Sequence, residues 1–277
     1  MPGVKRAREA VWFRHWVAES YSVRQLAQLS GHSPRTLWRI IAYWMGRRPV
    51  EEFDFSRFKH LIYDGTYFHK DGCFISLMDG RSQKIISHIY AQKEGYKTTV
   101  GWFRELRARG LYPLYITMDG ERSVIRAMAE TWPQARIQRC LYHIQREGMR
   151  WLRSYPKTPA GKALRVLLKT LCQIRTKEER DMFIEAFRTW IEAHKDFVLA
   201  LPRTQVAYKD LKKTMTLIRN ALPDMFYYLE DSAIHKTTNA LEGFYSRLKD
   251  HYRGHRGLSK KHRISYLSWY CYFKNHG

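Results

Sequence analysis

Three acidic residues fall where metal-dependent phosphoryl chemistry would need them. Asp64 and Asp119 each end a run of β-branched and aromatic residues, and Glu242 lies in a helical segment as the only Glu after Glu230. Two magnesium ions about 4 Å apart need bridging and flanking oxygens, and they then stabilise both the attacking and the leaving oxygen of an in-line displacement. We therefore expect Asp64, Asp119 and Glu242 to hold two Mg²⁺ ions, for which Mn²⁺ would substitute.

An Asp-Gly pair by itself indicates only a turn, which is how we interpret Asp71-Gly72 and Asp79-Gly80. Asp64 and Asp119 differ because apolar segments typical of buried strands lead directly into them. A lone acid at the end of such a strand is more often functional than structural. The pattern thus favours catalysis at these two positions.

The segments around the two aspartates alternate between strand and helix patterns. We expect strands over 59–68, 73–79, 84–91, 114–119 and 135–140, with helices over about 100–111 and 121–131. Three strands, a helix, a strand, a helix and a strand is the order of a ribonuclease-H-like α/β domain. In a sheet of that order the first and fourth strands are neighbours, so both aspartates would emerge at one edge.

The rest of the chain towards the C-terminus is predicted to be helical. Residues 154–231 contain helical stretches over 161–175, 177–193 and 207–222 without a strand pattern, which indicates an all-helical insertion. A last helix is expected over about 237–252. It aligns one acid with polar and basic residues on a single face, and basic residues continue the charge beyond it. We expect these to meet DNA phosphate: Ser246, Lys249, Arg253 and Arg256, followed by Lys260, Lys261 and Arg263.

Charge points to a polyanionic partner. Lys and Arg number 49 against 26 Asp and Glu, a formal net charge of +23. The excess is concentrated at the ends, because residues 1–50 and residues 232–277 each hold nine basic and two acidic side chains. A solubilising surface usually mixes both signs, so nucleic acid is the favoured partner.

The first fifty residues resemble a helix-turn-helix. Ser22 is placed to cap one helix, Gly31 to make the turn, and Ser33 with Pro34 to begin a second helix. We expect a first helix over 6–19 with Val11, Trp12, His15 and Trp16 at helical spacing. On the second capped helix we expect Leu37, Ile40, Ile41 and Trp44 to face inward, and Arg35, Thr36 and Arg39 to face outward towards DNA.

Other classes of protein are disfavoured. No apolar run is long enough to cross a membrane and no secretory signal is evident. Four widely spaced cysteines, without a Cys-x-x-Cys pair, argue against a disulfide framework or a zinc ribbon. We expect a reduced cytoplasmic protein, associated with the bacterial nucleoid.

Four segments together carry a family resemblance: Ile62-Tyr-Asp-Gly-Thr, Thr117-Met-Asp-Gly, Gln138-Arg-Cys-Leu-Tyr-His and Thr237-Thr-Asn-Ala-Leu-Glu. Over about residues 55–277 the chain resembles transposases of bacterial insertion sequences related to the Mutator-like eukaryotic enzymes. The resemblance implies a ribonuclease-H-like fold, a DDE triad made of Asp64, Asp119 and Glu242, and a helical insertion before the Glu. It also implies that Cys140 and His143 form an auxiliary Cys-x-x-His motif near the active site.

Cys140 and His143 also have the spacing of zinc ligands, but the sequence offers no second pair. We interpret Cys140 as a packing residue and His143 as a polar residue at the edge of the active site. Relatives of this kind often carry an N-terminal zinc ribbon that this sequence lacks. We therefore expect a shortened N-terminus, which leaves full recognition of the element's ends open.

These observations predict an α/β protein with four parts. Residues 1–48 would be a DNA-binding helix-turn-helix, 55–153 the first part of a ribonuclease-H-like catalytic domain, 154–235 the helical insertion, and 236–277 the catalytic helix with a basic C-terminal segment. The predicted function is a transposase that cuts and joins double-stranded DNA, at transposon ends and target, as a homodimer or higher oligomer. The alternatives are a catalytically idle relative that regulates through its helix-turn-helix, and a nuclease of the same fold. All three acids are present, which favours the enzyme.

Overall fold

A computed structural model describes residues 2–68, 72–255 and 257–277. The chain forms two compact units, one comprising residues 1–54, 65–94 and 239–277 and the other residues 55–64 and 95–238. Among the described residues, no helix is both long and apolar enough to span a membrane.

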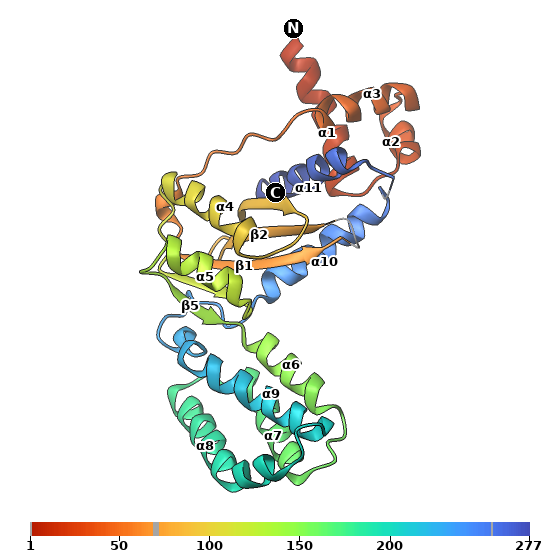
Figure 1. The fold of residues 1–277 in the computed structure, drawn as a ribbon. Helices are drawn as coiled ribbons and strands as arrows, with labels where there is room; N and C mark the ends of the chain where they lie inside the picture. Colours follow the sequence, from red (N-terminus) through yellow and green to blue (C-terminus); the bar gives the residue numbers. More distant parts are fainter. Residues whose placement is uncertain (1, 69–71, 256) are drawn as a thin grey trace. The chain divides into compact units, whose positions relative to one another are not determined.

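A five-stranded mixed sheet has the order β3-β2-β1-β4-β5 (Figure 1). β1 spans His60–Tyr67, β2 Cys73–Asp79, β3 Ile85–Ala91, β4 Tyr115–Met118 and β5 Arg136–Arg139. β1 pairs with β4 and β4 with β5 in parallel, whereas β2 and β3 are antiparallel. The five strands predicted from the sequence are therefore confirmed, including the proximity of the first and the fourth.

The turn between β2 and β3 is also confirmed. The Asp79 carboxylate accepts hydrogen bonds from the backbone N–H of Ser82 at 2.8 Å and from its hydroxyl at 2.7 Å. This acid is therefore occupied in closing a turn. The other predicted turn, at Asp71-Gly72, begins outside the described residues.

Two helices lie in the crossover connections between the parallel strands. α4, Tyr96–Ala108, leads into β4, and α5, Arg122–Thr131, connects β4 to β5. The two pack against each other, and the Trp132 indole at the end of α5 donates to the Leu111 carbonyl at 2.7 Å. Such βαβ connections are what parallel neighbours require, since a short hairpin joins only antiparallel strands.

Residues 141–221 form a helical bundle with its own core (Figure 1). Its helices are α6, Leu141–Leu152, α7, Pro159–Thr170, α8, Lys177–Ala200, and α9, Val206–Ala221. α7 and α9 match the predicted stretches closely, and α8 continues seven residues beyond its predicted end. α6 was not predicted, yet Leu141, Ile144 and Leu152 are buried in the bundle's core.

The N-terminal helices begin and end at the residues that their caps dictate. Ser22 caps α2, Val23–Ser30, in a capping box with Gln25, and Gly31 ends it at φ 68°. Ser33 then caps α3, Pro34–Met45, with Pro34 at its first position. Leu37, Ile40 and Ile41 are buried as predicted, whereas Met45 is buried and Trp44 only half-buried.

The first helix buries only Trp16 of the four residues that recur at helical spacing. α1 spans Pro2–Ala18, and Val11 is 50% exposed while Phe13, Trp16 and Val17 are buried. The reason is a second partner that the sequence pattern did not reveal. Phe13 contacts the rings of Trp269 and Phe273, and the Tyr266 hydroxyl donates to the Val17 carbonyl at 3.0 Å.

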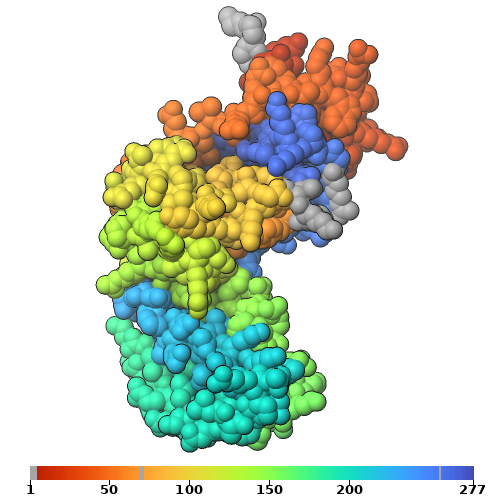
Figure 2. Space-filling model, viewed as in Figure 1, coloured from red at the N-terminus to blue at the C-terminus, as the bar shows by residue number. Residues whose placement is uncertain are grey.

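That partner is α11, Lys260–Asn275, a helix where we predicted only basic sequence. It packs against α1 and α3, and Figure 2 shows the blue C-terminal segment against the orange and red N-terminal helices. The preceding helix, α10, spans Asn239–Arg253, close to its prediction. The C-terminal segment thus contributes a core helix, not merely a basic tail.

Candidate active site

The register of two neighbouring strands sets Asp64 beside Asp119. Ile62 of β1 pairs with Thr117 of β4, and each aspartate lies two residues further along its own chain. Because parallel strands advance together about 4.8 Å apart, the two carboxylates leave the sheet side by side and on the same face. Both residues are half-buried. β1 and β4 are adjacent, as expected from the sequence, and their adjacency brings the two aspartates together.

Two contacts constrain Asp119 and Gly120, one from the backbone of Glu121 and one from the side chain of Arg139 in β5. The Asp119 carboxylate accepts from the backbone N–H of Glu121 at 3.1 Å. A Cβ added at Gly120 would collide with the guanidinium of Arg139. Burial lowers the pKa of Arg139 from its usual value, and the nearby carboxylates of Asp119 and Asp224 oppose that shift. Arg139 is therefore a cation closely packed onto the turn that follows Asp119.

Cys140 and His143 form a hydrogen-bonded group with Thr238. The Cys140 sulfur lies 3.2 Å from His143 Nδ1 and 3.5 Å from the Thr238 hydroxyl, and it accepts from the Thr238 backbone N–H at 3.3 Å. Cys140 and Thr238 are fully buried. Burial raises the pKa of the Cys140 thiol, which keeps it protonated near neutrality. Cys140 is thus a packed, neutral residue, as we predicted.

The same region anchors the chain segment that precedes α10. The Thr117 hydroxyl donates to the His235 carbonyl at 2.7 Å, and the Leu141 N–H donates to the Lys236 carbonyl at 2.9 Å. Together with the bonds to Thr238, these contacts fix residues 235–238 next to the end of β4. Gln138, which is also fully buried, donates to the Met225 carbonyl at 2.7 Å. The Gln138-to-His143 motif therefore has a defined architectural role.

Glu242 lies in the first turn of α10 and is half-buried. It follows Thr238 by four residues, about one helical turn of chain. Among residues 2–68, 72–255 and 257–277, no group of three or more His, Cys, Asp or Glu side chains that could hold a metal ion is found. The sheet brings together the pair Asp64 and Asp119, whose carboxylate oxygens are the donors that Mg²⁺ prefers.

The predicted basic face of α10 is less uniform than expected. Ser246 is exposed, but Lys249 is half-buried with its ammonium 5.6 Å from the centre of the Phe68 ring. A Lys249 that binds phosphate along this face would be expected to be exposed, whereas here its ammonium packs over the buried Phe68 ring. The Arg253 side chain is 67% exposed, and it pairs with Asp250 at 2.8 Å.

Beyond α10 the basic residues also differ from one another. Lys260 and Lys261 are exposed at the start of α11, whereas Arg263 is half-buried and donates to the hydroxyls of Tyr252 at 2.9 Å and Tyr90 at 3.3 Å. Arg263 thus packs against two tyrosines of the fold, and its phosphate contact stays a prediction. Arg256 lies outside the described residues.

The predicted reading helix presents two of its three polar residues to solvent. Arg35 and Arg39 on α3 are exposed. Thr36 is half-buried, and its hydroxyl lies 3.1 Å from that of Ser33 at the helix cap. Arg35 and Arg39 are consequently exposed cations of this face, and Thr36 contacts the residue that caps the helix.

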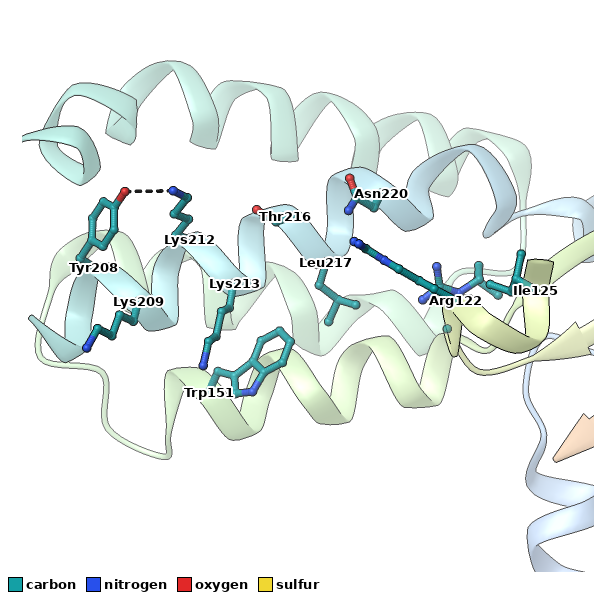
Figure 3. A pocket seen from close by; sticks show the side chains of 12 residues that line it. Arg122, Ile125, Trp151, Tyr208, Lys209, Lys212, Lys213, Thr216, Leu217 and Asn220 are labelled. Atoms are coloured by element: carbon teal, nitrogen blue, oxygen red, sulfur yellow. Dashed lines mark hydrogen bonds between the residues drawn. The ribbon is translucent and has the colours of Figure 1, made fainter. Parts of the chain in front are cut away.

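Several residues of the site were not identified from the sequence. Arg139, Gly120 and Arg122 lie close to the end of β4, and a cavity that they line continues to the basic residues of α9 (Figure 3). The available signal was Lys209 and Lys213, which recur at helical spacing within the insertion. Trp190 and Trp269 are core residues, since both are buried with their indole N–H donating to backbone carbonyls.

Comparison with known proteins identifies a family for this chain. Residues 74–256 match the model of a family described as transposase, Mutator family. The chain is also similar to a probable transposase for an insertion sequence element from Corynebacterium diphtheriae, with 24% identity over 221 residues. That alignment covers 71% of this chain and 64% of the relative, so the chain spans just under two thirds of the relative's length.

Proposed function

The chain belongs to the Mutator family of transposases, and from this premise we propose that it cuts the ends of an insertion sequence and joins them to target DNA. The observation that carries the proposal is the register of β1 and β4, which sets Asp64 level with Asp119. Two carboxylates side by side at the end of a parallel strand pair can coordinate divalent cations. We further propose that the sheet and its helices form a ribonuclease-H-like catalytic domain.

In this proposal Asp64, Asp119 and Glu242 would hold Mg²⁺, with Mn²⁺ as a substitute. The ions would supply charge stabilisation for the attacking and leaving oxygens of the transferred phosphoryl group. The protein itself positions the carboxylates. Strand register fixes Asp64 and Asp119, and the bonds of Cys140 and His143 to Thr238 fix the chain one turn before Glu242. Cys140 and His143 thereby act as positioning residues for the catalytic helix.

DNA recognition is proposed for the N-terminal helices. α2 and α3, joined at Gly31, would act as a helix-turn-helix in which the exposed Arg35 and Arg39 read a terminal sequence. A base-edge contact is worth roughly 1–3 kcal/mol of discrimination, whereas a phosphate contact weakens all sequences alike. Arg39→Ala should therefore lose affinity for cognate ends more than for random duplex. Equal losses on both DNAs would assign Arg39 to the backbone.

The DNA substrates and the oligomeric state follow from the proposed cutting and joining reaction. A transposase that joins two ends to one target acts on double-stranded DNA at three places, and we propose that it assembles as a homodimer or higher oligomer to do so. The net charge of +23 supports association with DNA of any sequence at low salt.

The test is strand cleavage of labelled duplex that carries the element's terminal repeat. Asp64→Asn, Asp119→Asn and Glu242→Gln should each abolish cutting and joining in Mg²⁺ while leaving duplex binding intact. Ca²⁺ should support binding without turnover. Asp196→Asn, on the exposed face of α8, removes the same charge away from the sheet and should cut at the wild-type rate. Normal cutting by any of the three site variants would overturn the assignment.

A further inference from the structure

A cavity of about 470 Å³ lies between the end of the sheet and the helical bundle, within one compact unit of the chain. Its lining comes from α5, β5, α6 and α9, and it begins at Gly120, immediately after Asp119. Five of the lining side chains are cationic and none is acidic: Arg122, Arg139, Lys209, Lys212 and Lys213. A recess of this composition selects an anion.

The cations are arranged along a line. Lys209 and Lys213 are one helical turn apart on α9, and both are exposed. In Figure 3 they point towards the side on which Trp151 of α6 lies, and Arg122 lies near the Leu217 and Asn220 end of the same helix. From Lys209 to Leu217 the helix rises roughly 12 Å. That length exceeds a single phosphate, so the recess can hold a short segment of a polyanionic strand.

The cavity also contains an apolar wall. The half-buried Trp151 lies beside Lys213 and Leu217, and Ile125 adds a further apolar side chain (Figure 3). In a duplex the bases are stacked on one another, so only the phosphates of the backbone could contact such a wall. An unpaired strand offers both phosphates for the lysines and a base face for the indole, which is how proteins commonly hold single strands.

The inner end of the cavity has an unmet hydrogen-bonding demand. Nε of Arg139 is buried, and within the described residues it has no hydrogen-bond partner. Its guanidinium covers Gly120, where the absence of a Cβ permits the close approach. As a residue that lines the cavity, Arg139 adds a cation beside the Asp119 turn.

We propose that this cavity binds a single-stranded segment of DNA, with phosphates on Lys209, Lys213 and Arg122 and a base stacked on Trp151. The proposal rests on the proposed function, since it gives that enzyme a place for a strand separated from its complement next to Asp119. Lys212 contributes less, because its ammonium donates to the Tyr208 hydroxyl at 3.2 Å and points away from Trp151 in Figure 3.

The experiment measures equilibrium binding of a labelled oligothymidine to the full-length protein in EDTA. No strand is cut under these conditions, so an inactive enzyme would leave the result interpretable. Lys209→Gln with Lys213→Gln should weaken binding about tenfold, which is the effect expected for the loss of two exposed charge contacts. The salt dependence of log K should fall by about 1.4, at roughly 0.7 per lost contact on a single strand.

The matched control is Lys177→Gln with Lys195→Gln. It removes the same charge from exposed positions of α8 that do not line the cavity. This variant should keep the wild-type affinity and slope. A loss equal to that of the cavity variant would reduce the effect to net charge and overturn the proposal.

The base-stacking step has its own variants. Trp151→Ala should weaken oligothymidine binding, and Trp151→Phe, which keeps an aromatic face and most of the packing, should restore much of it. Thermal unfolding of both variants separates a lost contact from a lost fold. Unchanged affinity in a folded Trp151→Ala variant would overturn the stacking assignment. A larger loss on blunt duplex than on oligothymidine would overturn the proposal in favour of duplex docking.

Discussion

The carboxylate pair at the strand ends and the basic cavity beside it use charge in opposite ways. Asp64 and Asp119 are placed by backbone register, because Asp64 lies within β1 and Asp119 directly follows β4. The cations of the cavity come from three different elements, α5, β5 and α9, and most of them are exposed side chains on long flexible stems. The strand register fixes two negative charges at defined points, whereas the cavity distributes five positive charges over its lining.

This difference predicts how each region tolerates change. A metal seat depends on oxygen positions within fractions of an ångström, so one methylene matters at the pair. Phosphate contacts are long-ranged and interchangeable, so the cavity should lose function in small, nearly additive steps. Substitutions that keep the charge and move it should therefore separate the two regions.

The largest effect is expected from Asp119→Glu. The carboxylate is kept but displaced by one methylene, and a misplacement of about 1 Å can cost about 10²-fold in rate. The matched substitution in the cavity, Lys213→Arg, also keeps the charge and lengthens the side chain. Cleavage rates in Mg²⁺ check both. Loss in Asp119→Glu with wild-type cutting in Lys213→Arg is the expected result, and similar rates in both would remove the distinction.

Gly120→Ala tests the point where the two regions meet. The added methyl would displace the Arg139 guanidinium, which borders both the Asp119 turn and the cavity. We expect cleavage to fall about 10- to 100-fold, the range for residues that support a metal site, together with weaker oligothymidine binding. Gly243→Ala is the control, because a Cβ there would meet only the end of the Arg247 side chain at 3.6 Å. A fall in cleavage without a change in single-strand binding would show that Arg139 serves the carboxylate side alone.

Thr238→Val tests the anchor that precedes α10. Valine keeps the shape but removes the hydroxyl that lies near Cys140 and His143. Cleavage should fall about tenfold, and oligothymidine binding should be unchanged. Thr131→Val removes another buried hydroxyl, one that donates to the Ala127 carbonyl within α5, and should cost similar stability without the catalytic loss. Thr238→Ser should restore most activity. Equal losses in the two valine variants would mean that only stability had changed.

Local signals account for the parts of the fold that the sequence predicted well. Ser22, Gly31, Ser33 and Pro34 act on backbone groups within a few residues of themselves, so the limits of α2 and α3 could be read directly. The strands and the adjacency of β1 and β4 followed from runs of apolar residues and their order. The aspartate pair is a consequence of that order, and so it was within reach of the sequence.

What the sequence did not reveal depends on tertiary packing. In α11 the residues Tyr266, Leu267, Trp269, Tyr270 and Cys271 are all buried, so no single apolar stripe marks the helix. Its packing against α1 also explains why Phe13, which the sequence pattern did not single out, is buried. The cavity has the same origin, since α9 is far in sequence from α5 and β5 and only the fold brings their cations together.

The smallest effect is expected from single lysine substitutions in the cavity, and it gives the finest test of graded charge. Lys213→Gln should weaken oligothymidine binding about two- to fivefold, at the scale of one exposed charge contact. Lys212→Gln should do less, because the Lys212 ammonium already donates to the Tyr208 hydroxyl and lies on the other side of α9 in Figure 3. Both residues are exposed and adjacent in sequence, so any effect of net charge is the same for the two variants. Affinities measured across a salt titration decide the matter. A slope reduced by about 0.7 in Lys213→Gln alone would place the strand on the Trp151 side, whereas equal slopes in the two variants would show that the cations act only through their sum.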